Sequence, residues 1–274
     1  MSFSSTTHFL YRWAFTLAAL ALLVACTASA QTLKDPSITH APKDGVIRAY
    51  GAGGPHTAYR RVAEIFEKET GIPVEIIAGP ESKWTKDAQR QADIIWGTSE
   101  QSMTAFLETY TEFASAKVEP LYIRPAVIAV QKGNPKGIEG FDDLLKPGMR
   151  IVVTEGAGIY NTSGNGVWED IAGRLGSLDD VKRFRDNIIA YAKGSGASFK
   201  AFKEQQADAW ITWMHWPINH PDDADYVEFK PERKIWRDTN MVISPKADPQ
   251  AVEFVEFLKN DRAAAIFRSE GWTR

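Results

Sequence analysis

The feature that most constrains the fold is an alternation of short apolar segments with helical segments in the first half of the chain. Residues 46–50 (VIRAY), 72–79 (IPVEIIAG) and 92–97 (ADIIWG) have the apolar, β-branched composition of buried strands. Residues 57–70 carry apolar side chains at helical spacing, and Gly71 follows them as a helix C-cap. Strands that alternate with helices in this way predict a parallel α/β sheet.

A second α/β pattern follows further along the chain. Residues 118–135 form a long extended stretch, and residues 149–156 and 207–213 have the composition of buried strands. We expect helices throughout residues 181–206 and a solvated loop at the acidic residues 221–226. The second half of the chain is therefore expected to form a sheet of its own.

The C-terminal part supplies a strand at residues 241–245 and a pair of helices within residues 249–272. These elements would close the first α/β unit, so we predict two lobes linked by crossing strands. The predicted divisions are a flexible leader at 31–44, lobe I at 45–123 together with 240–274, and lobe II at 124–239.

The N-terminal thirty residues have the organisation of a signal peptide. Residues 14–26 form an apolar run that is too short to cross a bilayer comfortably. Ala28-Ser29-Ala30 is a signal-peptidase motif, with cleavage after its last alanine. We therefore predict a signal peptide over residues 1–30 and a periplasmic location.

The same run offers an alternative. Leu23 to Cys26 (LVAC) fits a bacterial lipobox, in which Cys26 would be lipidated and would hold the protein at a membrane. Cys26 is the only cysteine of the chain, so a protein cut after Ala30 contains no disulfide.

Composition argues against several classes of function. The chain has 32 Lys and Arg against 35 Asp and Glu, a net charge of −3, so no basic excess points to nucleic acid. It contains no Walker A run, H-E-x-x-H pair or C-x-x-C pair, and Gln101 stands where a G-x-S-x-G elbow needs its last glycine. We expect no enzymatic activity, cofactor or metal.

Residues 51–57 (GAGGPHT) place three glycines between a predicted strand and a predicted helix. The spacing approaches the G-x-G-x-x-G dinucleotide fingerprint, but His56 replaces the third glycine, which lets helix and strand pack closely. Nucleotide binding is therefore disfavoured. Free N–H groups and the positive end of a helix dipole at such a turn suit an anion instead. A tight turn without a ligand is the plain alternative.

Three further turns are rich in glycine and small polar residues, and each precedes a predicted helix. Turns of this kind gather at the carboxyl edge of the strands in an open α/β sheet, where ligands bind. They are Gly97-Thr98-Ser99, with a predicted capping box from Thr98 to Gln101, then Asn161–Gly166, and finally Lys193–Ser198.

Residues 211–220 (ITWMHWPINH) concentrate tryptophan and histidine. Trp213 ends a predicted strand, where it either walls a ligand cleft or packs in the core. His215 and His220 lack a helical metal spacing and have a proline between them, so we predict no metal site there.

Several segments together resemble known families. Residues 124–153 resemble the middle of periplasmic oxyanion-binding proteins of the molybdate and sulfate type, and residues 251–272 resemble their closing helices. A narrower resemblance, to the accessory colonization factor C family and related bacterial surface antigens, runs across nearly the whole mature chain. Its most specific segments are residues 51–74, 92–102, 161–170 and 211–216.

The resemblance implies a two-lobed periplasmic binding protein of type II. Each lobe would be a mainly parallel sheet flanked by helices, and a small anion would bind in the cleft between the lobes. Its ligands would be tetrahedral oxyanions such as sulfate or molybdate, or small carboxylated or phosphorylated acids. By position, the implied ligand-binding residues are Gly53, Gly54, His56, Thr57, Thr98, Ser99, Thr162, Ser163, Gly164, Thr212 and Trp213.

Three functions fit such a site. A solute receptor would deliver the anion to the membrane component of an ABC transporter. A surface adhesin or a chemotaxis sensor would use the same fold, and lipidation at Cys26 would retain it at the surface. An enzyme would need a reactive group in the cleft, where His56 is the one base among the implied residues.

Overall fold

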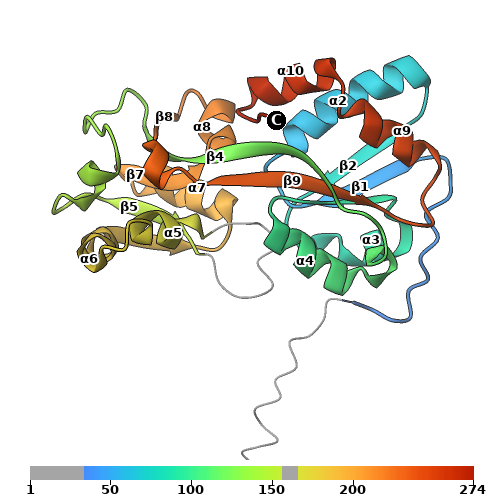
Figure 1. Ribbon diagram of the computed structural model, residues 1–274, viewed down its shortest axis with the longest axis horizontal. Helices are drawn as coiled ribbons and strands as arrows, with labels where there is room; N and C mark the ends of the chain where they lie inside the picture. Colours follow the sequence, from blue (N-terminus) through green and yellow to red (C-terminus); the bar gives the residue numbers. More distant parts are fainter. Residues whose placement is uncertain (1–33, 156–165) are drawn as a thin grey trace, which may run out of the picture.

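Two long strands cross the middle of the molecule and join two α/β halves (Figure 1). β4 (Glu119–Gln131) and β9 (Trp236–Ile243) pair antiparallel with each other. The computed structural model describes residues 34–155 and 166–274. The predicted signal peptide and the alternative lipobox lie outside the described residues.

The first half has a parallel sheet that is extended by a crossing strand. β1 (Ile47–Gly51) lies between β2 (Val74–Ala78) and β3 (Ile94–Gly97) and is parallel to both, while β3 pairs antiparallel with β9. The helices of this half are α2 (His56–Thr70), α3 (Thr85–Gln91), α4 (Glu100–Thr109), α9 (Gln250–Phe257) and α10 (Asp261–Ser269), with the 3-10 turns η1 (Glu81–Lys83) and η2 (Thr111–Phe113).

The second half repeats this arrangement. β5 (Ile151–Thr154) lies between β6 (Ile188–Ala192) and β7 (Ala209–Trp213) and is parallel to both, while β7 and β8 (Ala224–Glu228) pair antiparallel with β4. The strand order is β2-β1-β3-β9-β4-β7-β5-β6, with β8 also on β4. The helices are α5 (Val167–Gly173), α6 (Leu178–Asp186), α7 (Ser195–Glu204) and α8 (His215–Asn219), with the 3-10 turns η3 (Phe141–Leu145) and η4 (Pro231–Arg233).

The predicted α/β class is therefore confirmed, and each half has its own hydrophobic core. Phe66, Trp96 and Phe267 are buried in the core of the first half, and Trp168 and Phe184 in that of the second. β4 contributes buried side chains to both cores, so the chain passes from one half to the other inside this strand. The lobe boundaries at residues 123 and 240 stay a prediction.

Two strands correct the expectations from sequence. Residues 188–192 form the edge strand β6 rather than part of a helix, because a short apolar run fits a strand as well as a helix and tertiary pairing decides between them. The acidic segment 221–226 does not form a simple solvated loop, since β8 begins at Ala224 inside it. β8 pairs only with β4 among the described strands, so charged side chains on its outer face are tolerated.

The capping box predicted from Thr98 to Gln101 is shifted by one residue. Ser99 is the N-cap of α4, and its hydroxyl accepts a hydrogen bond of 3.1 Å from the N–H of Ser102. The Ser102 hydroxyl in turn accepts hydrogen bonds from the N–H groups of Ser99 and Thr98. Ser102 thus takes the role in the capping box that was expected of Gln101, because its short side chain fits this buried position.

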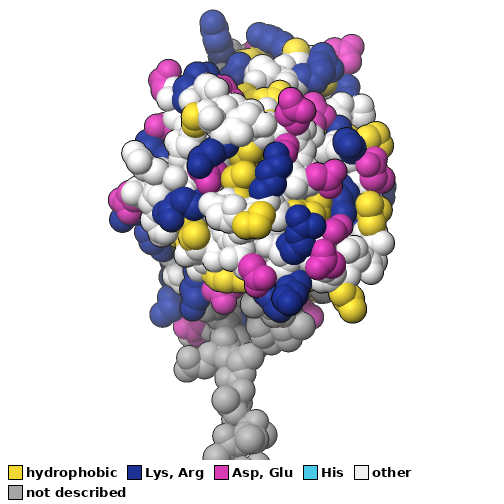
Figure 2. Space-filling view, turned by 90° about the vertical axis from the view of Figure 1, so that its left-hand side faces the viewer, with side chains coloured by type: hydrophobic (Ala, Val, Ile, Leu, Met, Phe, Trp, Pro, Cys, Tyr) yellow, Lys and Arg dark blue, Asp and Glu magenta, His cyan; other side chains and the backbone are white. Residues whose placement is uncertain are grey.

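The surface at the end of the second half, to the left in Figure 1, carries Lys and Arg side chains interspersed with Asp and Glu (Figure 2). No patch of a single sign dominates this face. Among the described helices, none has the length and apolar character needed to span a bilayer.

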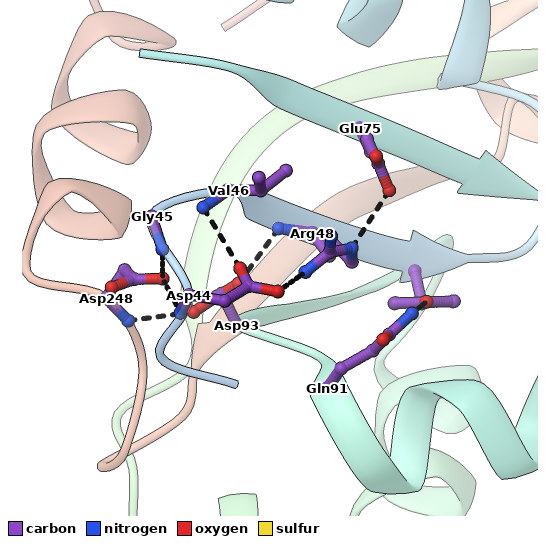
Figure 3. Close-up of polar contacts among 9 residues, drawn as sticks. Asp44, Gly45, Val46, Arg48, Glu75, Gln91, Asp93 and Asp248 are labelled. Carbon is purple, nitrogen blue, oxygen red and sulfur yellow. Dashed lines mark hydrogen bonds and ion pairs between the residues drawn. The ribbon is translucent and has the colours of Figure 1, made fainter. Parts of the chain in front are cut away.

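A buried carboxylate ties the start of the first sheet to the C-terminal helices (Figure 3). Asp93 is fully buried, and its two oxygens accept hydrogen bonds from the backbone N–H groups of Arg48, at 2.9 Å, and Asp248, at 2.8 Å. The Asp248 side chain accepts from the N–H groups of Asp44 and Gly45. Burial raises the pKa of Asp93 to about 6 despite these two hydrogen bonds.

We expect Asp93→Ala to lower the free energy of unfolding by about 1–3 kcal/mol, because two buried N–H groups lose their acceptor. The midpoint of thermal unfolding should fall by about 2–4 °C for each kcal/mol. Asp87→Ala removes an exposed carboxylate of the pair with Arg90 and should have little effect.

The pH dependence of this loss has a defined sign. The folded pKa of Asp93, about 6, lies above its ordinary value of 3.8, so the folded state holds the proton more tightly. The stability that Asp93 adds through its raised pKa is complete below about pH 4 and is lost as the pH rises through 6. Urea titrations should therefore show a larger deficit for Asp93→Ala at pH 5 than at pH 7.5, and an equal deficit would contradict the assignment.

Candidate functional site

A cleft of about 550 Å³ opens between the two halves. The residues that line it come from five separate segments of the chain, on both sides of the crossing strands. They are Ala52, Gly53, Gly54 and His56; Gly79, Pro80 and Glu81; Arg124; Lys193, Gly194, Ser195, Gly196 and Ala197; and Trp213, His215 and Trp216.

The glycine turn between β1 and α2 forms the wall on the side of the first half. Gly51 packs so closely on Trp96 that a Cβ would lie 2.4 Å from its indole ring. Gly54 has φ of +108°, and a Cβ there would lie 3.5 Å from Nε2 of His215. Gly53 has open space around it. The turn therefore brings backbone rather than side chains to the cleft.

The N-terminus of α2 follows this turn directly. Its N-cap is Pro55, which makes no side-chain capping bond, and its first turn contains no acidic residue. The N–H groups of the first turn and the positive end of the helix dipole are thus directed toward the cleft wall.

A second helix N-terminus meets the cleft from the other half. α7 begins at Ser195 after Gly194, whose φ of +87° suits glycine, and it too has no side-chain cap or acidic first turn. The hydroxyls of Ser198 and Thr154 lie 2.7 Å apart and fix α7 on β5. Lys193 adds a positive charge beside this turn.

Arg124 lies at the centre of the site on β4 and is 1% exposed. Its guanidinium carbon lies 4.5 Å from the ring centre of Trp213 and 4.4 Å from that of Trp272. Nε and Nη1 are buried and have no hydrogen-bond partner among the described residues. Burial lowers the pKa of Arg124 to about 9, which still leaves the group positively charged at neutral pH.

Two histidines lie beside this cation. His215 is buried, and neither of its ring nitrogens has a partner in the described structure; Nδ1 of His56 is buried and unpaired as well. Burial, with Arg124 and His56 nearby, holds the pKa of His215 well below its ordinary value. Burial and Arg60 lower the pKa of His56 in the same direction. Both rings are therefore neutral at neutral pH.

The structure brings four of the implied residues to the cleft. Gly53, Gly54, His56 and Trp213 all line it. Thr98 lies just behind, since its methyl group is 3.8 Å from the position of a Cβ on Gly54 and its buried hydroxyl has no partner among the described residues.

Three implied residues have other surroundings. The Thr57 hydroxyl donates to Glu270, Ser99 caps α4, and Thr212 is buried on β7 opposite β4. These contacts are structural ones, and a role of Thr57, Ser99 and Thr212 in ligand binding stays a prediction. Thr162, Ser163 and Gly164 lie outside the described residues.

Sequence reasoning missed Arg124 and His215, and it recognised the Lys193–Ser198 turn without including it in the site. A signal for Arg124 was present, because a single arginine interrupts the apolar strand YIRPAVIAV. A charge inside a buried strand requires a partner or a ligand. No group of three or more metal-ligating side chains occurs in the described part of the chain.

The neutral state of His215 can be tested directly. Its folded pKa lies below the unfolded value of 6.5, so its contribution to stability is present above pH 6.5 and is lost as the pH falls through the folded pKa. In the ligand-free protein, the NMR resonances of the His215 ring should not titrate between pH 8 and 6.5. A midpoint at or above 6.5 would contradict the burial described here.

Comparison with known proteins places the chain in a family. The sequence profile of the bacterial extracellular solute-binding protein family matches residues 47–273, which is most of the chain. The protein belongs to this family.

Solved structures agree with this assignment. PEB3 with bound L-phospholactate is 40% identical, with a TM-score of 0.79 over 83% of this chain and 99% of that chain. Peb3 from Campylobacter jejuni is 39% identical with a TM-score of 0.77 and the same coverage. The molybdate-binding protein of Azotobacter vinelandii shares the fold at 16% identity, with a TM-score of 0.61 over 83% of this chain and 99% of that chain.

A curated relative adds a more distant sequence match. The sulfate-binding protein of Synechococcus elongatus is 27% identical over 160 residues, which cover 53% of this chain and 45% of that protein. The matched segment thus spans less than half of the length of that relative.

Proposed function

We propose that this protein captures a small organic anion in the cleft between its halves, outside the cytoplasm, and delivers it to a membrane transporter. The ligand class is a phosphorylated or carboxylated acid. The observation that carries the proposal is the buried, unpaired guanidinium of Arg124.

A buried cation without a hydrogen-bond partner is costly, because it has left water and gained no acceptor in exchange. No carboxylate of the described residues forms an ion pair with Arg124, whereas Arg233, which is also buried, bonds Asp180 and two backbone carbonyls. An anion in the cleft would supply the missing acceptors through charge-assisted hydrogen bonds. The unpaired N–H groups of Arg124 thus lack acceptors that a bound anion would supply.

The remaining groups support the same class of ligand. The N-termini of α2 and α7 approach the cleft from opposite halves, and both lack side-chain caps. Helix N-termini favour anions through free N–H groups and the helix dipole. Closure of the halves around the ligand would bring these donors to it together.

The size of the cleft favours an organic anion over a bare oxyanion. A volume of about 550 Å³ falls in the range of small-molecule sites and exceeds the needs of sulfate or molybdate. PEB3, which is 40% identical, has been crystallised with L-phospholactate, a phosphorylated three-carbon acid. Trp216 and Pro80 provide apolar surface for a carbon skeleton beside the anionic group.

This proposal has three further parts. The protein is exported through its N-terminal signal, it is cleaved after Ala30, and it is a member of the accessory colonization factor C group. The family match to extracellular solute-binding proteins supports the location. The candidate groups of the cleft bind and release an anion, and we propose no catalytic step.

The first test is a thermal-shift panel with sulfate, molybdate, phosphate, citrate, phosphoglycerate and L-phospholactate. A ligand at about a hundred times its Kd stabilises the folded state by roughly 2.7 kcal/mol, which raises the midpoint by about 5–10 °C. We expect the largest shift with a phosphorylated acid. The absence of a shift with any of these anions would overturn the proposal.

Arg124→Gln should abolish the shift while leaving the ligand-free protein folded. Removal of the guanidinium breaks no ion pair and relieves a buried charge, which offsets the loss of the contacts with Trp213 and Trp272, so the ligand-free midpoint should change little. Arg90→Gln, at an exposed position, is the matched control and should bind as the wild type does. Retention of wild-type affinity in Arg124→Gln would contradict the role of the cation.

Gly53→Val separates binding from folding. A Cβ at Gly53 meets no atom within 4 Å, so the folded protein should accept the side chain, which would enter the cleft and weaken binding. Gly51→Ala should instead destabilise the fold, because its Cβ overlaps Trp96. Calorimetric titration and thermal melts of both variants distinguish the two effects. Unchanged affinity in Gly53→Val would remove the glycine turn from the site.

A further inference from the structure

The C-terminus of the chain lies between α8 of the second half and α2 of the first (Figure 1). After α10 ends, Trp272 is buried at 1% exposure. Thr273 then pairs with Ile123 through two backbone hydrogen bonds of 2.7 and 2.8 Å. Ile123 immediately precedes Arg124, so this pairing fixes Trp272 next to the side chain of the central cation.

Both halves hold the tail in place. Gly271, with φ of +80°, is so close to α8 that a Cβ would lie 2.8 Å from Met214 and Ile218. The buried side chain of Glu270 accepts hydrogen bonds from Thr57 and Arg61 on α2. The position of the Trp272 ring is therefore determined by contacts on two sides.

The two indoles that enclose Arg124 have different positions. Trp213 lines the cleft, whereas Trp272 is not among the lining residues, although both ring centres lie within 4.5 Å of the guanidinium carbon. Trp272 also stacks on His215, with ring centres 5.7 Å apart and planes at 20°. It thus contacts two of the polar groups that would face an anion without reaching the cleft itself.

An indole stabilises a buried cation in a way that a carboxylate cannot. Its face attracts the guanidinium electrostatically, and it accepts none of the N–H groups at the guanidinium edge. A carboxylate would neutralise Arg124 but would occupy the donors that an anion needs. Asp238, on the neighbouring strand β9, is the acidic side chain that interacts most with Arg124, and it forms no ion pair with it.

We propose that Trp272 is a positioning residue for anion binding: with Trp213 it encloses the Arg124 guanidinium, keeps it unpaired, and directs its free N–H groups to the cleft. This inference rests on the proposed function. It assigns a binding role to a side chain that lies outside the cleft and within three residues of the C-terminus.

The test compares Trp272→Phe with Trp272→Leu and Trp272→Met by calorimetric titration of L-phospholactate and of sulfate. An aromatic face is retained in Trp272→Phe, so its affinity should stay within about threefold of wild type. The aliphatic variants lose the face, and their affinity should fall by about tenfold or more. The second aliphatic variant keeps the comparison available if one of them does not fold.

Two controls exclude a merely structural effect. Phe254→Leu alters the same hydrophobic core away from Arg124, so it should lower the unfolding midpoint without changing affinity. Asp238→Asn in the Trp272→Leu background should recover part of the lost affinity, because it removes the carboxylate that competes for the released guanidinium.

The outcomes separate the two proposals. If the wild type binds neither of these anions nor any other anion of the thermal-shift panel, the proposed function fails and this inference fails with it; if it binds another anion of the panel, the Trp272 variants are titrated with that anion. If the wild type binds but Trp272→Leu binds equally well, or Phe254→Leu loses as much affinity as Trp272→Leu, only the role of Trp272 is overturned. The expected result is that Trp272→Phe, alone among the Trp272 variants, keeps an affinity close to that of the wild type.

Discussion

The antiparallel pairing of β4 with β9 is the interaction on which the rest of the structure depends. It connects two sheets that are otherwise built from local βα units, and it does so with continuous strands. Because β4 contributes to both cores, its midpoint lies where the two halves meet. Arg124 is at that midpoint, so the ladder fixes its backbone in the floor of the cleft.

Three arginines show how the surroundings decide what a charge does. Arg48 is paired with Asp44 and Glu75, and Arg233 is buried but bonded to Asp180 and two carbonyls. Arg124 is buried in contact with two indoles and keeps unpaired N–H groups. The first two stabilise local structure. In the function proposed here, the third offers its N–H groups to a ligand, and the family match to solute-binding proteins supports that proposal.

The failures of sequence reasoning have a common physical origin. The segment that forms β6 and the acidic segment that begins β8 carry weak local signals, and their strands exist because β5 and β4 offer pairing partners. The N-cap of α4 is Ser99 rather than the predicted Thr98, because the buried Ser102 and not Gln101 completes the capping box. Thr57, Ser99 and Thr212 were predicted to bind the ligand, and in the folded chain their side chains make structural contacts that local sequence does not reveal.

The sequence by itself determined the α/β class, the crossing strands and the glycine turn at the N-terminus of α2, because hydrophobic periodicity and glycine chemistry are local properties. The resemblance to a known family also implied Gly53, Gly54, His56 and Trp213 as ligand-binding residues, and the structure brings these four to the cleft. Only the tertiary structure decided that Arg124, His215 and Trp272 gather around one point. These residues come from β4, α8 and the C-terminal tail, and nothing local in the chain specifies that these segments meet; the packing of the two halves does.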